Sequence, residues 1–204
     1  MKWVGLVAML IEHVAHFASG MTQGWPFVIG RLAFPLFTVA LAVGCAQKTL
    51  VELRYVVVRL AAWGVAAGVL GMLVREPVPL NILFTFALGI TLHVTLRDTR
   101  AGKLMVSAAV LIAAMFVEYG VLGVIAVAIA MHGARHAEPM PRAGMFLLAA
   151  LLIACVKFNQ PAVIAIPALL ALAMFPVEVP RLRGFFYVAY AMQWPVIAAV
   201  KVAL

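Results

Sequence analysis

The first apolar run of the chain, LVAMLIEHVAHFA at residues 6–18, carries three ionisable side chains: Glu12, His13 and His16. Ionisable groups at membrane depth are costly, and they usually face a bundle interior or a water-filled cavity. The run therefore predicts a membrane helix that contributes to a polar site. Arg31, in the second apolar run, is a possible counter-charge.

The composition excludes a soluble globular domain. Of the 204 residues, 67% are hydrophobic and only 11% are charged, with a mean hydropathy of +1.14, and apolar runs recur from end to end. Glu12 and His13 interrupt the first run where a secretory signal would be uniformly apolar, so we interpret it as a retained span. We predict an all-α, multi-pass membrane protein that forms a single domain over residues 1–204.

Nine apolar runs predict nine transmembrane helices. A span needs roughly 20 apolar residues, although shorter helices are tolerated where the bilayer is thin or deformed. The fifth and sixth runs are separated only by Glu118-Tyr119-Gly120, so one continuous helix over 104–131 is the competing interpretation. The runs cover residues 3–19, 27–47, 55–74, 80–96, 104–117, 119–132, 143–157, 161–176 and 184–203.

The distribution of lysine and arginine favours nine helices, because cytoplasmic loops of membrane proteins carry an excess of both. With a cytoplasmic N-terminus and a periplasmic C-terminus, only Arg75, Lys157 and Lys201 lie in or beside outer connections. A merged helix over 104–131 would erase this bias. The inner side then holds Lys2, Lys48, Arg54, Arg97, Arg100, Lys103, Arg135, Arg142, Arg181 and Arg183.

The same topology places the intramembrane polar residues at one depth, in the outer half of the bundle. On a regular helix, His16 can face either Glu12 or His13 and bridge the two. A neutral histidine can act as a general base that a glutamate orients, and an arginine can bind a developing oxyanion. Acyl transfer fits these residue types, although proton-coupled transport uses the same ones. The set comprises Glu12, His13, His16, Arg31, Asn81, Thr85 and Glu118.

Each of these residues also has a purely structural interpretation. His16 can hydrogen-bond between helices, and Glu12 can form a structural ion pair with Arg31. Asn81 and Thr85 can cap the fourth helix, and Glu118 can be solvated at a helix boundary. The conjunction of glutamate, histidine and arginine is harder to explain by packing alone.

Metal and nucleic-acid binding are not predicted. The two cysteines lack CxxC or histidine spacing, and the apolar runs contain no HExxH motif. The net charge of +8 comes from basic residues scattered along short connections, whereas nucleic-acid binding requires them on one soluble face.

Four segments follow one another across most of the chain: MLIEHV (9–14), GRLAFPLF (30–37), LNILFTFALG (80–89) and EYGVLGV (118–124). A basic segment with Arg54, Arg59 and Leu60 lies where the third span begins. Together, and in this order, these pieces resemble the TraX family of conjugative pilin acetylases.

The resemblance implies a bacterial inner-membrane protein that transfers acetyl from acetyl-CoA to the N-terminus of a conjugative pilin subunit. It implies His13 as the catalytic base with Glu12 and Arg31 as partners. His16, Asn81, Thr85, Glu118, Tyr119, Tyr190 and Gln193 would supply the surrounding site. Acetyl-CoA would dock through its phosphates on Arg54, Arg59, Arg97, Arg100 and Lys103, whose alternative roles are topology and anionic lipid contact.

The chain departs from the family pattern in two places. Val43 precedes Gly44 where the family has a glutamate, and Gln193 stands in the last run where a histidine is expected. Glutamine can hydrogen-bond but cannot take a proton at neutral pH. Another pilin-maturation step such as cyclisation therefore stays open, as do a non-catalytic pilin chaperone and a proton-coupled transporter. A transporter would be expected to show repeated halves, which the sequence lacks.

Overall fold

The computed structural model describes residues 2–18, 20–21, 24–72, 74, 80–97, 102–156, 163, 166–167 and 184–203. Within these residues the chain is helical, apart from an isolated backbone bridge between Leu80 and Val117. Almost all of the predicted eighth span, 161–176, lies outside the described residues, as does Arg100. The predicted all-α class is confirmed for the described part of the chain.

The helices follow the other eight predicted runs. The first run forms α1 (Lys2–His13), which continues into a π-helical turn, η1 (Val14–Ala18). The remaining helices are α2 (Trp25–Gly30), α3 (Ala33–Cys45), α4 (Leu50–Gly71), α5 (Ile82–Arg97), α6 (Lys103–Ala113) with the 3-10 turn η2 (Ala114–Phe116), α7 (Gly120–Gly133), α8 (Pro139–Ala154) and α10 (Phe185–Ala203).

Three helical segments are long and apolar enough to cross a membrane: Trp25–Cys45, Leu50–Gly71 and Phe185–Ala203. Five other apolar helices in the described part of the chain are shorter, at 10–17 residues. At 1.5 Å of rise per residue these shorter helices cross a full bilayer core only where it is thinned. Length and composition thus establish three candidate spans.

The continuous helix considered over 104–131 does not form. The η2 turn ends at Phe116, and Gly120 begins α7 with a φ of +58°, a left-handed backbone conformation that glycine adopts readily. Between them, the Leu80 N–H donates to the Phe116 carbonyl (2.9 Å) and the Glu118 N–H donates to the Leu80 carbonyl (2.8 Å). These bonds fix the α6–α7 turn against the start of α5.

The second run, predicted as one helix over 27–47, is broken at Arg31 and Leu32. The Leu32 N–H donates to the carbonyl of Ile29 (3.0 Å), three residues earlier, so α2 ends in a tight turn before α3 begins. The break lies four residues before Pro35, which has no N–H to bond the Arg31 carbonyl and whose ring would clash with that carbonyl in a continuous helix. Beside the break, a Cβ atom on Gly30 would overlap the side chain of Glu12, so α1 and α2 approach closely there. Arg31 therefore follows the last residue of α2, at a helix end that packs closely against α1.

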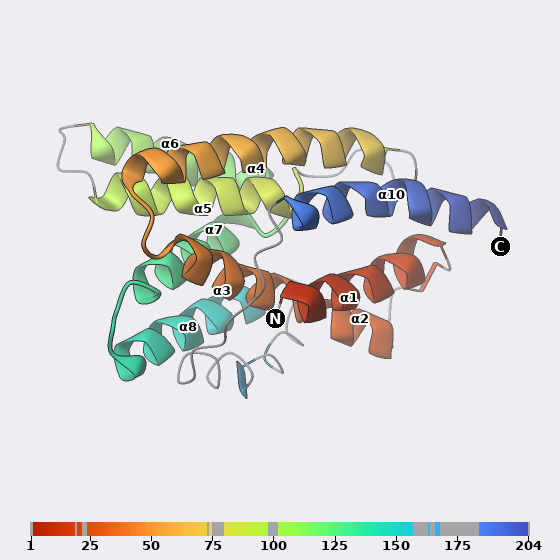
Figure 1. Ribbon diagram of the computed structural model, residues 1–204, viewed down its shortest axis with the longest axis horizontal. Helices are drawn as coiled ribbons and strands as arrows, with labels where there is room; N and C mark the ends of the chain where they lie inside the picture. Colours follow the sequence, from red (N-terminus) through yellow and green to blue (C-terminus); the bar gives the residue numbers. More distant parts are fainter. Residues whose placement is uncertain are drawn as a thin grey trace.

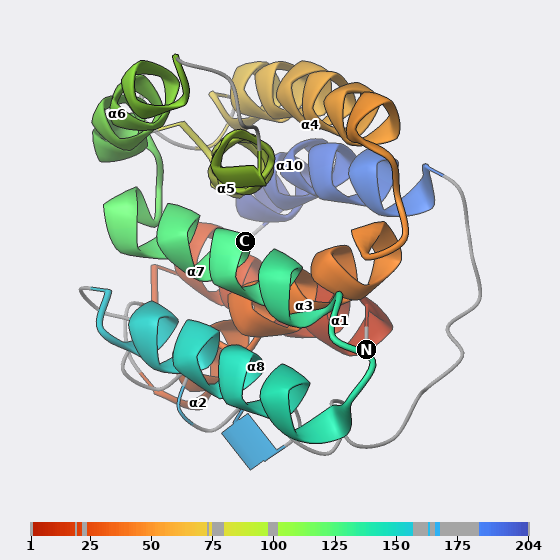
Figure 2. The same cartoon turned by 90° about the vertical axis from the view of Figure 1, so that its left-hand side faces the viewer.

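The helices stack in layers (Figures 1 and 2). Helices α6, α5 and α4 lie side by side, α7 packs on α5 and α8, and α10 packs on α4. Helix α3 packs on α7 and α1, and α1 also packs on α2. Phe34, Leu53, Ile90, Phe146 and Trp194 are fully buried among these layers. The polar residues described next lie where α1, α2, α5, α7 and α10 come together.

Candidate functional site

Glu12 and Arg31 form an ion pair between α1 and the α2–α3 break. Their Oε1 and Nη2 atoms are 2.6 Å apart, and the two side chains are only 15% and 20% exposed. The Arg31 guanidinium also lies 4.1 Å from the centre of the Phe27 ring. The predicted counter-charge is therefore in contact, as either a structural pair or a catalytic one would require.

His13 pairs with Gln193, which lies 180 residues later on α10. The His13 Nδ1–H donates to the Gln193 Oε1 at 2.9 Å. Because a carbonyl oxygen only accepts, this bond requires the proton on Nδ1, and the neutral ring then has its lone pair on Nε2. The imidazole also stacks on Trp194, with ring centres 5.1 Å apart, and meets the edge of Phe17.

Asn81 and Glu118 cap the start of α5. The Asn81 Nδ2 donates to the Gly64 carbonyl of α4 (2.7 Å), and its Oδ1 accepts from the Leu83 N–H (3.1 Å). The Ile82 N–H donates to the Glu118 Oε2 at 3.0 Å. The capping role considered for Asn81 is confirmed.

Two of the residues considered near this cap behave differently. Thr85 lies in the second turn of α5 rather than at its end, so it does not cap the helix, and its buried hydroxyl has no partner among the described residues. Glu118 is bound to the first turn of α5, so it is not merely solvated.

Tyr119 and Glu118 link the capped start of α5 to the ion pair of Glu12 with Arg31. The Tyr119 ring stacks on Phe34 with ring centres 3.7 Å apart, and its hydroxyl interacts with Arg31. Glu118 lies within electrostatic range of Glu12. Of the seven residues predicted to lie together, Glu12, Arg31, Asn81 and Glu118 are linked by these contacts, and His13 adjoins Glu12. We call the following set the polar cluster: Glu12, His13, Arg31, Asn81, Glu118, Tyr119 and Gln193.

His16 is not part of the polar cluster, and the predicted bridge to Glu12 or His13 is not formed. Its side chain is exposed, and its ring lies against the edge of Phe17 (4.5 Å between ring centres). The reason is the wider π-helical turn of η1, which begins directly after His13. The three-residue and four-residue spacings of a regular α-helix no longer stack there.

The basic residues expected to hold coenzyme A lie on three neighbouring helices. Arg54 and Arg59 are exposed on α4, and the Arg59 guanidinium lies 5.6 Å from the centre of the Tyr187 ring on α10. Arg97 and Lys103 lie at the end of α5 and the start of α6, and Arg97 lines a cavity between α5, α6, α7 and α8. Arg59 and Arg97 therefore have different neighbours.

The sequence reasoning missed several residues that shape the polar cluster. Gly30 permits the close approach of α1 and α2, and Phe17, Phe34 and Trp194 pack the polar side chains. Gly30 and Trp194 directly adjoin Arg31 and Gln193 in the sequence, which was the available signal. Tyr190, predicted as a site residue, is buried on α10 one turn before Gln193.

The TraX protein family matches residues 1–201 of the sequence. This chain belongs to the TraX family. Two relatives named "Protein TraX", from Escherichia coli and from Escherichia coli strain K12, are 30% and 29% identical to it over 164 residues. The aligned part covers 78% of this chain and 64% of each relative, so it spans less than two thirds of their length. No solved structure matches. The family inferred from the motifs is confirmed.

Proposed function

We propose that this TraX-family chain is an inner-membrane acetyltransferase that acetylates the N-terminus of a conjugative pilin subunit with acetyl-CoA. The observation that carries the proposal is the fixed pairing of His13 with Gln193, one residue from the ion pair of Glu12 with Arg31. A base in a defined tautomer next to a cation suits acyl transfer to an amine.

In this mechanism His13 acts through Nε2, because Nδ1–H is held by Gln193. Nε2 takes a proton from the pilin ammonium, and the freed amine attacks the thioester carbonyl. The C–N bond forms and the C–S bond breaks. The imidazolium returns its proton to the leaving thiolate, and the second proton, lost by the attacking nitrogen, is released to water. Gln193 cannot take a proton, so it acts as a positioning residue.

Arg31 is the proposed oxyanion partner. Glu12 engages its Nη2, and its buried Nε has no partner among the described residues. A guanidinium held on one side by a carboxylate presents its remaining N–H groups in a fixed direction. Charge that develops on the thioester oxygen would be stabilised by such a preorganised donor.

We place the donor's phosphates on Arg54 and Arg59. Arg59 lies over Tyr187 of α10, and Gln193 follows six residues later on that helix, about 9 Å of helical rise. Helices α4 and α10 pack together, so a pantetheine arm that follows this interface leads from the arginines toward His13. Arg97 lines the separate cavity between α5, α6, α7 and α8.

The proposed topology has nine spans, with a cytoplasmic N-terminus and a periplasmic C-terminus. Acetyl-CoA would approach from the cytoplasm, while the pilin N-terminus would meet the polar cluster in the outer half of the membrane. The separate α6 and α7 helices support this count, because a merged helix would reverse the side of every later loop.

The test is the intact mass of pilin from cells with and without this protein. We expect one added acetyl group with the wild-type chain, and a loss of at least about 100-fold in acetylated pilin for His13→Ala and Arg31→Ala. His136→Ala, at a histidine beyond the end of α7, is the matched control and should acetylate normally. Wild-type acetylation by His13→Ala would exclude this histidine as the base.

The same measurement separates the alternatives. Loss of one water from pilin would indicate cyclisation, which the glutamine at position 193 keeps open. Unchanged pilin mass with altered pilin abundance would indicate a non-catalytic chaperone. Either result would replace acetyl transfer as the function.

A further inference from the structure

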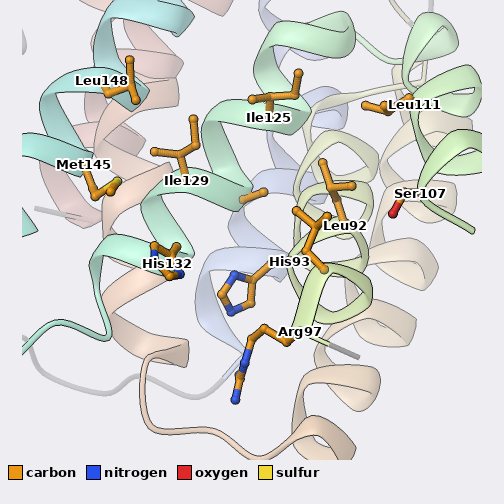
Figure 3. A pocket seen from close by; sticks show the side chains of 12 residues that line it. Leu92, His93, Arg97, Ser107, Leu111, Ile125, Ile129, His132, Met145 and Leu148 are labelled. Atoms are coloured by element: carbon orange, nitrogen blue, oxygen red, sulfur yellow. The ribbon is translucent and has the colours of Figure 1, made fainter. Parts of the chain in front are cut away.

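A second site lies away from the polar cluster, in a cavity of about 690 Å³ between α5, α6, α7 and α8 (Figure 3). This volume is within the range of about 300–1,000 Å³ that is typical of pockets for small amphiphilic ligands. The walls are mainly apolar, formed by Leu92, Leu96, Leu111, Ile125, Ile129 and Leu148.

One end of the cavity is basic. His93, Arg97 and His132 lie together there, and Figure 3 shows them at the opposite end from Leu148 and Ile125. The His93 side chain is only 3% exposed, and its Nε2 has no hydrogen-bond partner among the described residues. Arg97, His132 and Arg135 are all within electrostatic range of His93.

Protein carboxylates do not neutralise this end within the described part of the chain. Among the described residues, the salt bridge found joins Arg31 to Glu12 in the polar cluster, and none involves Arg97. Asp98, the next residue, lies outside the described residues. The His93 ring hydrogen-bonds the Ala128 carbonyl through its other nitrogen, so the Nε2 of the neutral ring can only accept a hydrogen bond. The charge of Arg97 therefore calls for an anionic ligand, and the Nε2 of His93 calls for a hydroxyl donor on that ligand.

The cavity is bordered by side chains that face outward. Leu96 is 62% exposed and Leu148 is 44% exposed, and both line the cavity. The outer surface of α6 is also apolar, with Leu104 and Met105 about four-fifths exposed. In a membrane such surfaces contact acyl chains, so the entrance is from the side of the bilayer.

We propose that this cavity binds an anionic phospholipid. One acyl chain lies along the leucine and isoleucine walls, Arg97 and His132 hold the phosphate, and a headgroup hydroxyl donates to the Nε2 of His93. A zwitterionic lipid would place its own ammonium beside Arg97, so the site prefers a net negative headgroup. Basic pockets between membrane helices recognise lipid headgroups by the same physics. The site is distinct from Arg54 and Arg59, and it does not depend on the proposed acetyl transfer.

The test measures lipid retained by the purified full chain, with phosphatidylglycerol and phosphatidylethanolamine of identical acyl chains as probes in native mass spectrometry. We expect phosphatidylglycerol to be retained in preference. Arg97→Gln should weaken that retention about fivefold, the effect of one basic side chain on an anionic lipid. Arg54→Gln, an exposed arginine of α4, is the matched control and should retain the lipid as the wild type does.

A second variant tests the position of the acyl chain. Leu148→Trp adds bulk at a partly exposed wall position, so it should lower phosphatidylglycerol retention in protein that remains folded. Equal retention of the two lipids, or an equal loss in Arg54→Gln and Arg97→Gln, would overturn the proposal. Displacement of phosphatidylglycerol by acetyl-CoA would also overturn it, because the basic end would then belong to the donor.

Discussion

The polar cluster and the basic end of the cavity both contain histidine and arginine, but they differ in how those side chains are satisfied. In the cluster, Arg31 meets Glu12 and His13 meets Gln193 across helix interfaces. At the cavity, Arg97 has no described ion-pair partner, and space remains beside it. The pairings fix the geometry of the cluster while leaving the Arg31 Nε without a partner among the described residues, whereas at the cavity the charged group itself is unpaired beside a void. The same residue types therefore serve different roles.

The largest difference in unfolding free energy is expected between Arg31→Ala and Arg97→Ala. The first leaves the mostly buried Glu12 carboxylate without its partner, which should cost about 2–3 kcal/mol of unfolding free energy. The second removes an exposed side chain and should cost less than about 0.5 kcal/mol. Reversible unfolding in lipid-free mixed micelles measures both, and equal costs would remove the distinction between the two regions.

Two glycine substitutions probe packing in the same two regions. Gly30→Ala places a Cβ against Glu12, so we expect a loss of about 1–3 kcal/mol from overpacking. Gly144→Ala, on the helix α8 that borders the cavity, meets nothing within 4 Å and should stabilise the protein by up to about 1 kcal/mol. Thermal unfolding would compare them, and a neutral Gly30→Ala would show that α1 and α2 are not held this closely.

A smaller effect is expected for the polar residues that bind backbone. Asn81→Ala removes the bonds to the Gly64 carbonyl and the Leu83 N–H and should cost about 1–2 kcal/mol. Ser107→Ala, at the cavity wall, should change stability by less than about 0.5 kcal/mol. Unfolding in mixed micelles should rank the pair in this order. The reverse ranking would contradict the capping role.

Among the variants of the polar cluster, the smallest loss of stability is expected for Gln193→Leu, which removes one hydrogen bond to His13 and should cost about 1 kcal/mol. Its diagnostic readout is the tautomer. Nitrogen NMR of the wild type should show the His13 proton on Nδ1, while the variant should show a mixture of tautomers. Gln193→His, which restores the residue type expected from the family, should recover the single tautomer. A mixture already present in the wild type would contradict the positioning role.

Structural features that follow from the free-energy cost of placing a polar residue in an apolar segment were predictable from sequence. The separation of α6 from α7 was predicted from the distribution of lysine and arginine, and it falls at Glu118-Tyr119-Gly120, where the structure breaks the helix. The pairing of Glu12 with Arg31 was also anticipated, since a buried carboxylate needs a counter-charge.

Features set by tertiary contact were not predictable. The close approach of Gly30 to Glu12 depends on how α1 packs against α2, whereas Pro35, four residues after Arg31, was a local signal for the break that was missed. The π-helical turn displaced His16 from the position that a regular helix predicted. The basic residues Arg59 and Arg97 were grouped by their side of the membrane alone, which cannot tell which face of the bundle each one occupies.

The hydrogen bond from Ile82 to Glu118 has a consequence for the order of biosynthesis. The two residues are 36 positions apart, so the first turn of α5 leaves the ribosome well before the side chain that caps it. The backbone hydrogen bonds of Leu80 likewise form only after Phe116 and Glu118 have been synthesised. During translation, the α4–α5 hairpin therefore reaches the membrane with its connecting end unfinished. It is completed only when the turn after α6 emerges, which makes that turn the step that locks the first half of the bundle.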